Sequence, residues 1–288
     1  MSVKELNAPK SVPLVSTAWL TERLGAPGLR IVDASWYLPA MNRDGKAEFG
    51  QGHIPGAIFF DLDEISDRSS DLPHMLPDPA GFETAMAALG VSNDDEIVVY
   101  DGGGLFSAPR VWWMLRIFGA PNVHVLDGGL PKWKSEGRPL EQGAASPAPS
   151  RFSATFKTSA VAGMADVAQA LESRSAQVLD MRPAGRFSGE TPEPRPNLSS
   201  GHMPGALSLP ASDLISNGSL KPTEQLLDAF RRAGVDPDKP LITSCGSGVS
   251  AAIANLALEV AGKPQPKLYD GSWTEWASRG KPIAKGGQ

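Results

Sequence analysis

The chain has 288 residues, of which 41% are apolar and 20% are charged, and its formal net charge is −5 at pH 7. This composition is typical of a globular protein, and the length favours two domains of about 150 residues each. The negative charge disfavours nucleic acid as a partner, and no apolar run approaches the roughly 18 residues of a membrane span. Because the first residues lack the apolar segment of a secretion signal, we expect a cytoplasmic protein with no membrane partner.

Short runs rich in β-branched residues alternate with helical patterns along the chain. In chain order, we predict a strand at residues 29–33, a helix at 82–89, a strand at 97–100, a helix at 108–118, strands at 123–126 and 177–180, a helix at 224–233, a strand at 241–243, a helix at 249–260 and a strand at 267–269. The first three helices each end before a glycine suited to the left-handed position after a helix. This alternation predicts an α/β fold, a mostly parallel sheet with helices on both faces.

Several motifs occur twice in the same order. Gly-His-Ile-Pro-Gly-Ala at residues 52–57 returns as Gly-His-Met-Pro-Gly-Ala at 201–206, 149 positions later. The segment from Asp-Gly to Trp at 127–133 returns at 270–276, 143 positions later. An ordered set of matches with nearly constant spacing indicates two copies of one domain.

The repeats also suggest where the two copies begin and end. We predict an N-terminal domain at residues 1–142 and a C-terminal domain at 158–288. The segment between them, 143–157, is rich in Gly, Ala, Ser and Pro, and this composition suits a linker.

Cys245 is the only cysteine of the chain. A single cysteine excludes an internal disulfide framework, a Cys-x-x-Cys redox pair and a multi-cysteine zinc site, and we expect no metal and no cofactor. A lone cysteine is ordinarily a small buried apolar residue, so a functional role depends on its surroundings.

The surroundings of Cys245 favour catalysis. The residue lies at the carboxyl end of a predicted strand, where parallel sheets place their active sites. Gly246, Ser247 and Gly248 follow it before the next helix. Two glycines permit a tight loop whose backbone N–H groups turn inward, and the helix adds its positive end. Because such a cradle stabilises a thiolate, we predict that Cys245 is a nucleophile.

The tandem Gly-His-x-Pro-Gly-Ala turns, the strand-cysteine-loop-helix unit and the segment Asp-Gly-Ser-Trp-Thr-Glu-Trp resemble the rhodanese superfamily of sulfurtransferases over nearly the whole chain. The resemblance implies two rhodanese-like domains, of which the N-terminal one has Asp101 in place of the nucleophile. Cys-Gly-Ser-Gly-Val followed by Ser or Thr is similar to the branch that acts on 3-mercaptopyruvate, whereas the thiosulfate branch has basic residues directly after the cysteine. Ser250 keeps the hydroxyl where Thr is usual.

The resemblance implies a sulfurtransferase that moves the sulfur of 3-mercaptopyruvate through a Cys245 persulfide to an external thiol or cyanide and releases pyruvate. Because no second cysteine exists, the acceptor is external, such as a small thiol or a thioredoxin-like protein. A thiosulfate sulfurtransferase and a low-turnover persulfide carrier or interaction module remain as alternatives. The loop residues expected to contact the substrate are Gly246, Gly248, Val249 and Ser250.

Two arginines, Arg186 and Arg195, lie in a proline-rich stretch after the strand at 177–180. A planar guanidinium binds a carboxylate through two hydrogen bonds, which suits an α-keto acid. Ordinary surface salt bridges would explain the same pattern. The resemblance implies that both arginines hold the substrate.

His74 lies in a long polar loop, residues 66–77, with no apparent counterpart in the second copy. The resemblance implies that His74, Asp63 and Ser247 form a proton relay, which requires a site between the two domains, a common place for a ligand. His53 and His202 belong to the repeated turn and are expected to have a structural role.

Phosphatase chemistry is the remaining interpretation of a cysteine loop on this fold. It needs an arginine six positions after the cysteine to hold phosphoryl oxygens. Ala251 stands at that position, so we do not expect phosphatase activity.

Overall fold

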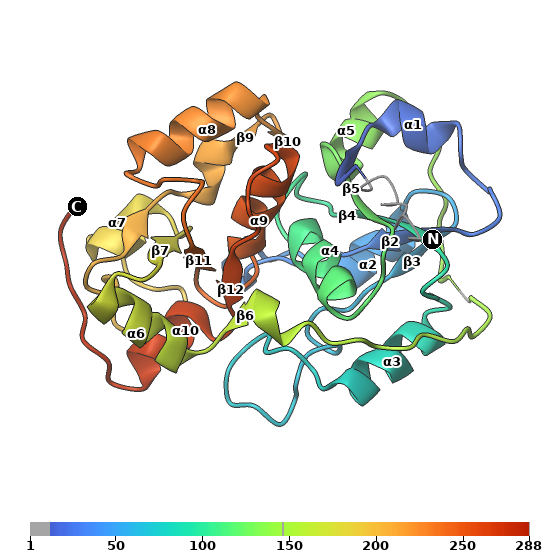
Figure 1. Cartoon of the computed structure of the whole chain (residues 1–288). Coiled ribbons are helices and arrows are strands. Elements are labelled where there is room, and N and C mark those ends of the chain that lie inside the picture. Colours follow the sequence, from blue (N-terminus) through green and yellow to red (C-terminus); the bar gives the residue numbers. More distant parts are fainter. Residues whose placement is uncertain (1–11, 146, 288) are drawn as a thin grey trace, which may run out of the picture.

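The computed structural model describes residues 12–145 and 147–287, and it has two lobes, one from each half of the chain (Figure 1). The strand order is β1-β5-β4-β2-β3 in the N-terminal sheet and β6-β12-β11-β7-β8 in the C-terminal sheet. All strand pairs within these two sheets are parallel. The equivalent orders confirm two copies of one fold, which we call the N-terminal copy and the C-terminal copy.

The N-terminal copy is built from ten main elements and one 3-10 turn. They are β1 (Leu14–Val15), α1 (Thr17–Thr21), β2 (Leu29–Asp33), η1 (Pro39–Met41), α2 (Gly45–Gln51), β3 (Ala57–Phe59), α3 (Pro79–Ala88), β4 (Glu96–Tyr100), α4 (Ala108–Ile117), β5 (Val123–Leu126) and α5 (Gly129–Ser135).

The C-terminal copy repeats this order and adds a small hairpin between β8 and α8. Its elements are η2 (Thr158–Ala160), β6 (Val161–Ala162), α6 (Met164–Ser173), β7 (Gln177–Asp180), α7 (Ala184–Ser188), β8 (Leu207–Ser208), η3 (Ala211–Leu214), β9 (Ile215–Ser216), β10 (Ser219–Leu220), α8 (Thr223–Arg232), β11 (Leu241–Ser244), α9 (Ala251–Val260), β12 (Lys267–Tyr269) and α10 (Ser272–Ser278).

The six predicted strands and four predicted helices are confirmed, with ends that differ by three residues at most. The largest difference is at α3, which begins at Pro79 because the Asp78 side chain accepts the N–H of Gly81 and caps the helix. The glycines after α3, α4 and α8 have φ values of +68°, +103° and +76°, as predicted for left-handed positions. The edge strands have only two or three residues, too few to show a period in the sequence.

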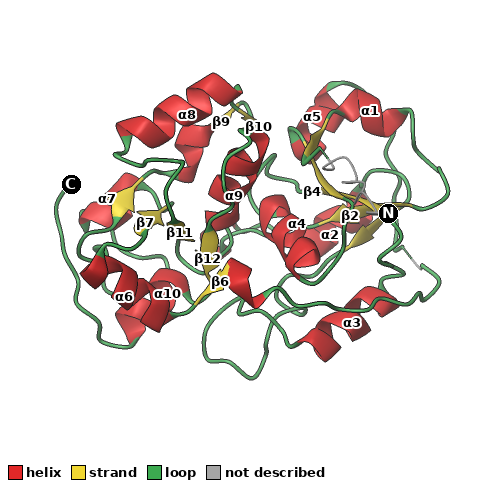
Figure 2. Ribbon diagram, in the orientation of Figure 1, coloured by secondary structure: helices red, strands yellow, loops and turns green. Residues whose placement is uncertain are grey.

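Helices cover both faces of each sheet (Figure 2). On the outer faces, Leu20 of α1 and Trp133 of α5 belong to one apolar cluster and Trp273 of α10 to another. On the inner faces, α3, α4, α8 and α9 contribute to a single cluster that includes residues of both copies. Because α4 packs on α9, the two copies share one continuous core, and a site between them is held by rigid elements.

The predicted linker is laid along the N-terminal copy. Ser150 donates from its N–H to the carbonyl of Ala87, and the N–H of Thr155 donates to the carbonyl of Phe118. The Phe152 ring packs edge-on against Phe82. These contacts fix the path between the copies. The domain limits at residues 142 and 158 stay a prediction.

Residues 1–11, Ser146 and Gln288, which include most of the segment judged for a secretion signal, lie outside the described residues. Along 12–145 and 147–287, no helix combines the length and the apolar composition that crossing a membrane requires.

Candidate active site

Cys245 follows β11 directly and is buried, with 2% of its surface exposed. The chain then turns through residues 246–250 into α9. Gly248 has a φ of +76°, and a Cβ atom there would lie 3.0 Å from both the Arg110 guanidinium and the carbonyl oxygen of Asp270. Glycine is required at this point both by backbone conformation and by space.

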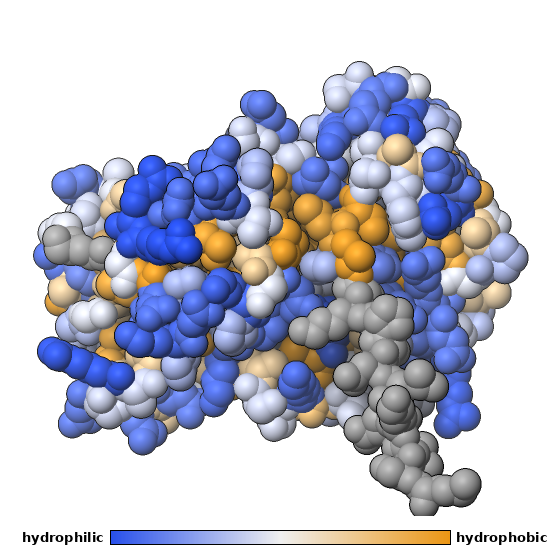
Figure 3. Space-filling view, turned by 45° about the horizontal axis from the view of Figure 1, so that its top comes forward, coloured by the Kyte–Doolittle hydropathy of each residue, from blue (hydrophilic) through white to orange (hydrophobic). Residues whose placement is uncertain are grey.

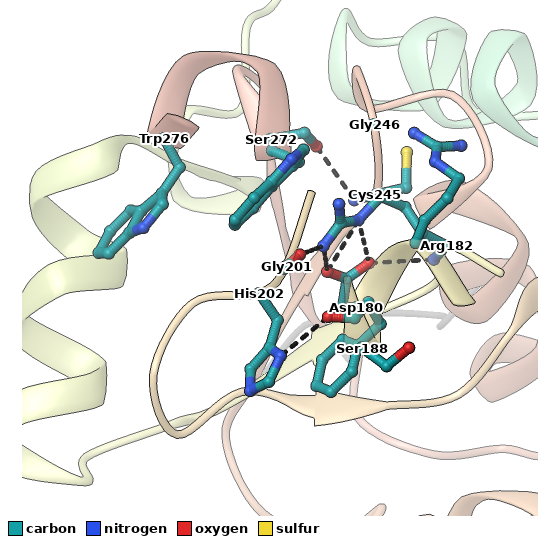
Figure 4. Close-up of polar contacts among 12 residues, drawn as sticks. Asp180, Arg182, Ser188, Gly201, His202, Cys245, Gly246, Ser272 and Trp276 are labelled. Atoms are coloured by element: carbon teal, nitrogen blue, oxygen red, sulfur yellow. Dashed lines mark hydrogen bonds and ion pairs between the residues drawn. The ribbon is translucent and has the colours of Figure 1, made fainter. Parts of the chain in front are cut away.

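Ser272, the first residue of α10, holds the cysteine loop from inside. Its Oγ accepts the N–H groups of Cys245 at 3.2 Å and of Gly248 at 3.0 Å, and it donates to the carbonyl of Tyr269 at 2.8 Å. Figure 4 shows the bond to Cys245. Ser272 has a φ of +51°, a left-handed conformation unusual for serine. The N–H of Gly248, expected to face the substrate, is therefore already bonded within the protein.

The next residues of α10 hold the carbonyl groups of the loop. The N–H of Trp273 donates to the carbonyl of Cys245, and the N–H and Oγ1 of Thr274 donate to the carbonyl of Gly246. With these carbonyls turned toward α10, several loop N–H groups have no acceptor among the described residues and can bind a sulfur anion or a substrate oxygen. They belong to Gly246, Ser247, Val249 and Ser250.

The structure brings the three predicted relay residues together from both copies. His74 Nδ1 lies 2.9 Å from Ser247 Oγ, and His74 Nε2 lies 3.0 Å from Asp63 Oδ1. Burial lowers the pKa of His74, although Asp63 opposes this shift. The hydrogen bond from His74 lowers the pKa of Asp63. At neutral pH this favours a neutral imidazole beside a carboxylate, so that Nε2–H donates to Asp63 and Nδ1 accepts the Ser247 hydroxyl proton.

Trp36, to which the sequence analysis gave no role, supports this relay. Its Nε1 donates to both carboxylate oxygens of Asp63, at 3.2 and 3.1 Å. Its ring packs edge-on against His74 with centroids 4.6 Å apart. The aromatic residue after β2 therefore fixes both the acid and the imidazole, and the Asp63 side chain remains 64% exposed to solvent.

Both predicted arginines reach the loop. A Cβ atom on Gly246 would lie 3.1 Å from Arg186 Nη2 and 3.6 Å from Arg195 Nη1. Arg195 Nη2 donates to Ser247 Oγ at 3.1 Å, and burial lowers the pKa of Arg195. Arg186 is paired with Glu193, whereas Arg195 has no carboxylate within 4.0 Å among the described residues. Arg195 is thus the cation more open to an incoming carboxylate.

A buried charge network that the sequence analysis missed holds Arg186 in place. Arg182 donates to both oxygens of Asp180 and also to Glu193, which in turn accepts from Arg186. Figure 4 shows the pair of Arg182 and Asp180 below the cysteine loop. Arg182 also stacks on Trp273 of α10, 4.2 Å from its ring centroid. An Asp-x-Arg pattern at the end of a strand was the available signal.

The histidines of the repeated turns have the expected structural role. His53 stacks on Phe49 and His202 on Phe187, each with ring centroids 3.9 Å apart, and each Nδ1 lies within hydrogen-bond distance of the carbonyl of the same Phe. Over the described part of the chain, no group of three or more His, Cys, Asp or Glu residues is arranged to hold a metal ion.

The expectation that the His74 loop has no counterpart is wrong. Leu76 of this loop donates its N–H to Asp270 in the C-terminal copy, and Leu220 of β10 donates its N–H to Asp127 in the N-terminal copy. Each copy thus extends a loop to the Asp-Gly turn of the other. The sequences of the two loops are too different for the repeat to be recognised before folding.

A cavity of about 520 Å³ lies between the copies, beside Arg186. Its wall is mostly apolar and includes Phe106 and Leu105 of one copy and Met181 and Ile253 of the other. Apolar residues also gather in the hollow between the two lobes (Figure 3). Arg186 and Ser250 lie in the same wall, so this cavity adjoins the end of the cysteine loop.

The fold and the site define a two-copy α/β protein with one cysteine at the carboxyl end of a parallel sheet and a His-Ser pair joined across the copies. The rhodanese-like domain matches residues 16–136 and 164–279, once over each sheet. The chain belongs to the rhodanese family.

Similar proteins include both 3-mercaptopyruvate and thiosulfate sulfurtransferases. The chain is 48% identical over 266 residues to the 3-mercaptopyruvate sulfurtransferase of Escherichia coli (strain K12), covering 92% of this chain and 95% of the relative. It is 44% identical to the thiosulfate sulfurtransferase of Bos taurus, covering 93% of each. The crystal structure of the Escherichia coli 3-mercaptopyruvate sulfotransferase SseA has a TM-score of 0.85 and 45% identity and covers 91% of this chain and 99% of that one.

Proposed function

We propose that the protein transfers the sulfur of 3-mercaptopyruvate through a persulfide on Cys245 to an external acceptor and releases pyruvate. The observation that carries this proposal is the Ser247 hydroxyl, held between His74 Nδ1 at 2.9 Å and Arg195 Nη2 at 3.1 Å, two residues after the cysteine. The relatives named as 3-mercaptopyruvate sulfurtransferases support it.

In the first half-reaction, the Cys245 thiolate attacks the sulfur of the substrate, the S–C bond breaks, and its electron pair leaves as the enolate of pyruvate. Arg195 and Arg186 bind the carboxylate and the keto oxygen and orient the sulfur toward Cys245. The substrate's thiol proton passes through Ser247 to His74 and returns to the enolate carbon. Neutral His74 is suited to accept this proton, and ionised Asp63 stabilises the imidazolium.

The persulfide on Cys245 then remains in the loop until an acceptor binds. The N–H groups of Gly246, Ser247, Val249 and Ser250 stabilise its outer sulfur as an anion. An external thiolate or cyanide removes that sulfur and restores the Cys245 thiolate. The apolar cavity beside the loop suits a small thiol or the active-site segment of a thioredoxin-like protein. Because a lone reactive thiol persists best in a reducing compartment, we place the reaction in the cytoplasm.

Thiosulfate is the competing sulfur donor, since a relative with that named activity is 44% identical. The positions after the cysteine are Gly246 and Ser247, so no basic side chain is present there to meet a dianion. Comparing kcat/KM for the two donors on the purified protein tests the choice. We expect mercaptopyruvate to be preferred by at least about tenfold, which corresponds to 1.4 kcal/mol. Preference for thiosulfate would overturn the assignment.

A persulfide carrier with little turnover is the third interpretation. The assembled relay of Ser247, His74 and Asp63 argues against it, because a carrier needs no proton transfer. Multiple turnovers of pyruvate release with a small thiol as acceptor distinguish an enzyme from a carrier, which would stop after one pyruvate per chain.

A further inference from the structure

One buried ion pair crosses between the copies beside the relay. Arg110 of α4 is 0% exposed and donates from Nη2 to Asp270 Oδ1 at 2.7 Å. Burying two charges costs several kcal/mol, and such a pair is weak evidence for stability by itself. Its other contacts show what it does here.

Both partners of this pair hold the backbone around His74. Arg110 Nη2 donates to the carbonyl of His74 at 2.8 Å, and Asp270 Oδ2 accepts the N–H of Leu76 at 2.8 Å. A backbone group on each side of the His74–Leu76 segment is therefore fixed by a charge. Arg110 also lies against Gly248 of the cysteine loop, with Nη1 3.5 Å from its carbonyl oxygen.

His74 needs this support because its backbone is strained. Its φ is +60°, a left-handed conformation that costs a residue with a Cβ free energy, and such strain persists only where the surroundings impose it. The equivalent point in the other loop, two residues before Leu220, is Gly218, which has a φ of +77° without this cost. Glycine would avoid this cost at position 74, but the proposed relay requires a histidine side chain there.

The C-terminal copy supplies the comparison for Arg110. Counting from the first residues of α4 and α9, Ile253 is the counterpart of Arg110. Among the described residues, Asp127 is the one side chain of the N-terminal copy that hydrogen-bonds to the loop ending at Leu220, and the counterpart Ile253 carries no charge. The junction between a loop and an Asp-Gly turn thus forms without a buried arginine, which is present only on the side that carries His74.

We propose that Arg110 and Asp270 are positioning residues that hold His74 in its strained conformation so that its Nδ1 meets Ser247. This inference rests on the proposed function for its kinetic consequence. Neither side chain is assigned contact with the substrate. They act through the His74 backbone.

Arg110→Gln tests the proposal, with Arg116→Gln as the matched control. Arg116 also lies on α4, pairs with an acid of the C-terminal copy, Glu259, and stacks on a tryptophan, but it does not contact the His74 loop. We expect Arg110→Gln to slow pyruvate release by about 10- to 100-fold, part of what a positioned acid-base group contributes. Arg110→Lys, which keeps the charge, should recover part of the rate, and Arg116→Gln should change it less than threefold.

A double-mutant cycle with His74→Ala separates positioning from general damage. If Arg110 acts through His74, Arg110→Gln loses its effect on pyruvate release once the imidazole is absent. An equal loss in the wild-type and His74→Ala backgrounds would overturn the proposal, as would an equal effect of Arg116→Gln. Melting curves verify that each variant is folded. If Arg110→Gln does not fold, Asp270→Glu repeats the cycle, because it keeps the charge but moves the carboxylate relative to Leu76.

A readout without substrate makes failure of this proposal distinguishable from failure of the proposed function. The chain has four histidines, so the His74 ring signals in an NMR spectrum are assigned by their loss in His74→Ala. We expect these signals to shift and broaden in Arg110→Gln and to stay in place in Arg116→Gln. Unchanged His74 signals in Arg110→Gln would contradict the positioning role even if mercaptopyruvate were not the donor.

Discussion

Each copy has a loop between its central strand and the following helix, residues 101–107 and 245–250, and the two loops use their backbone N–H groups differently. In the N-terminal copy the loop is filled by the Asp101 carboxylate, which accepts the N–H groups of Gly103, Phe106, Ser107 and Ala108 at 2.8–2.9 Å. In the C-terminal copy the equivalent residue is Cys245, and several N–H groups stay open. A cradle for negative charge is thus a property of the fold, and one residue decides whether it is occupied or reactive.

The helix that follows the last strand, α5 in one copy and α10 in the other, also differs in its bonds to the loop. Ser272 and Thr274 of α10 bond to the cysteine loop, whereas Gly129 and Pro131 stand at the corresponding places of α5. A Cβ atom on Gly129 would lie 2.5 Å from the carbonyl oxygen of Asp101. The backbone bond is common to both copies, since Leu130 donates its N–H to the carbonyl of Asp101 as Trp273 does to that of Cys245, but only α10 adds side-chain hydroxyls.

The buried acids at the ends of β2 and β7 show a second difference. Asp180 is paired with Arg182, but the residue two positions after Asp33 is Ser35. Burial raises the pKa of Asp33 to about 6. The C-terminal copy pairs its buried acid with an arginine, and the N-terminal copy leaves the equivalent acid without that partner.

Exchanging the residues at positions 101 and 245 should have the largest effect. We expect Cys245→Ser to abolish pyruvate release and sulfur uptake, because no other thiol exists in the chain. Adding Asp101→Cys should not restore either activity, since His74 and both arginines lie at the other loop. Mass spectrometry after incubation with mercaptopyruvate measures the sulfur on each peptide. A persulfide at position 101 with turnover would show that the loop alone suffices.

Removing Arg195, which has no carboxylate partner among the described residues, should have the next largest effect. Losing one partner of a desolvated charged pair costs about 2–5 kcal/mol, so Arg195→Ala should lower kcat/KM by about 30-fold to several thousand-fold. Arg186→Ala should cost less, because Glu193 already neutralises Arg186. Steady-state kinetics of both variants give the order. A change of less than threefold in Arg195→Ala would remove it from substrate binding.

Asp33 makes stability depend on pH. The folded state keeps the Asp33 proton up to about pH 6, while the unfolded chain loses it near the ordinary aspartate pKa of 3.8. Stability therefore falls as pH rises through this window, and the full penalty is present above pH 6. Asp33→Asn should raise the free energy of unfolding by about 3 kcal/mol at pH 7.5, from the size of the shift, and much less near pH 4.

The equivalent substitution in the other copy is the control. Asp180→Asn removes the charge that pairs with buried Arg182, so it should lower stability at pH 7.5. Denaturant titrations at both pH values measure these differences. If Asp33→Asn and Asp180→Asn changed the free energy of unfolding in the same direction at pH 7.5, the distinction between the two acids would be contradicted.

Thr274→Val gives the smallest expected effect. It deletes the hydroxyl bond to the Gly246 carbonyl, and one hydrogen bond contributes about 0.5–1.5 kcal/mol. We expect iodoacetamide to alkylate Cys245 about 2- to 10-fold more slowly, because the N–H cradle becomes less ordered. Ser278→Ala, which removes an exposed hydroxyl from the same helix, is the control. Equal rates for wild type and Thr274→Val would show that α10 does not order the loop.

Local patterns were sufficient to predict the central strands, the helices that end at glycine and the cysteine loop. Cys245 could be recognised because strand, glycines and helix are contiguous in the sequence. The edge strands could not, since Leu14–Val15 and Leu207–Ser208 are held by pairing alone. The relay residues His74 and Asp63 came from the family resemblance, because their distance from Ser247 depends on how the two copies pack.

Buried polar partners were the part of the site that the sequence did not reveal. Glu193 and Arg110 look like ordinary surface charges in the sequence, and their roles depend on burial created by the fold. The role of Trp36 has no sequence signal either, because only the folded chain shows its Nε1 donating to Asp63. Pairing of charges across elements has no local signature.

A single turnover without acceptor tests whether Cys245 carries the sulfur. Purified protein is mixed with excess 3-mercaptopyruvate, and pyruvate and the mass of the Cys245 peptide are followed together. We expect a burst of about one pyruvate per chain and one added sulfur atom on Cys245, which a small thiol then removes. Pyruvate released without sulfur on Cys245, or sulfur on Cys245 without pyruvate, would contradict it.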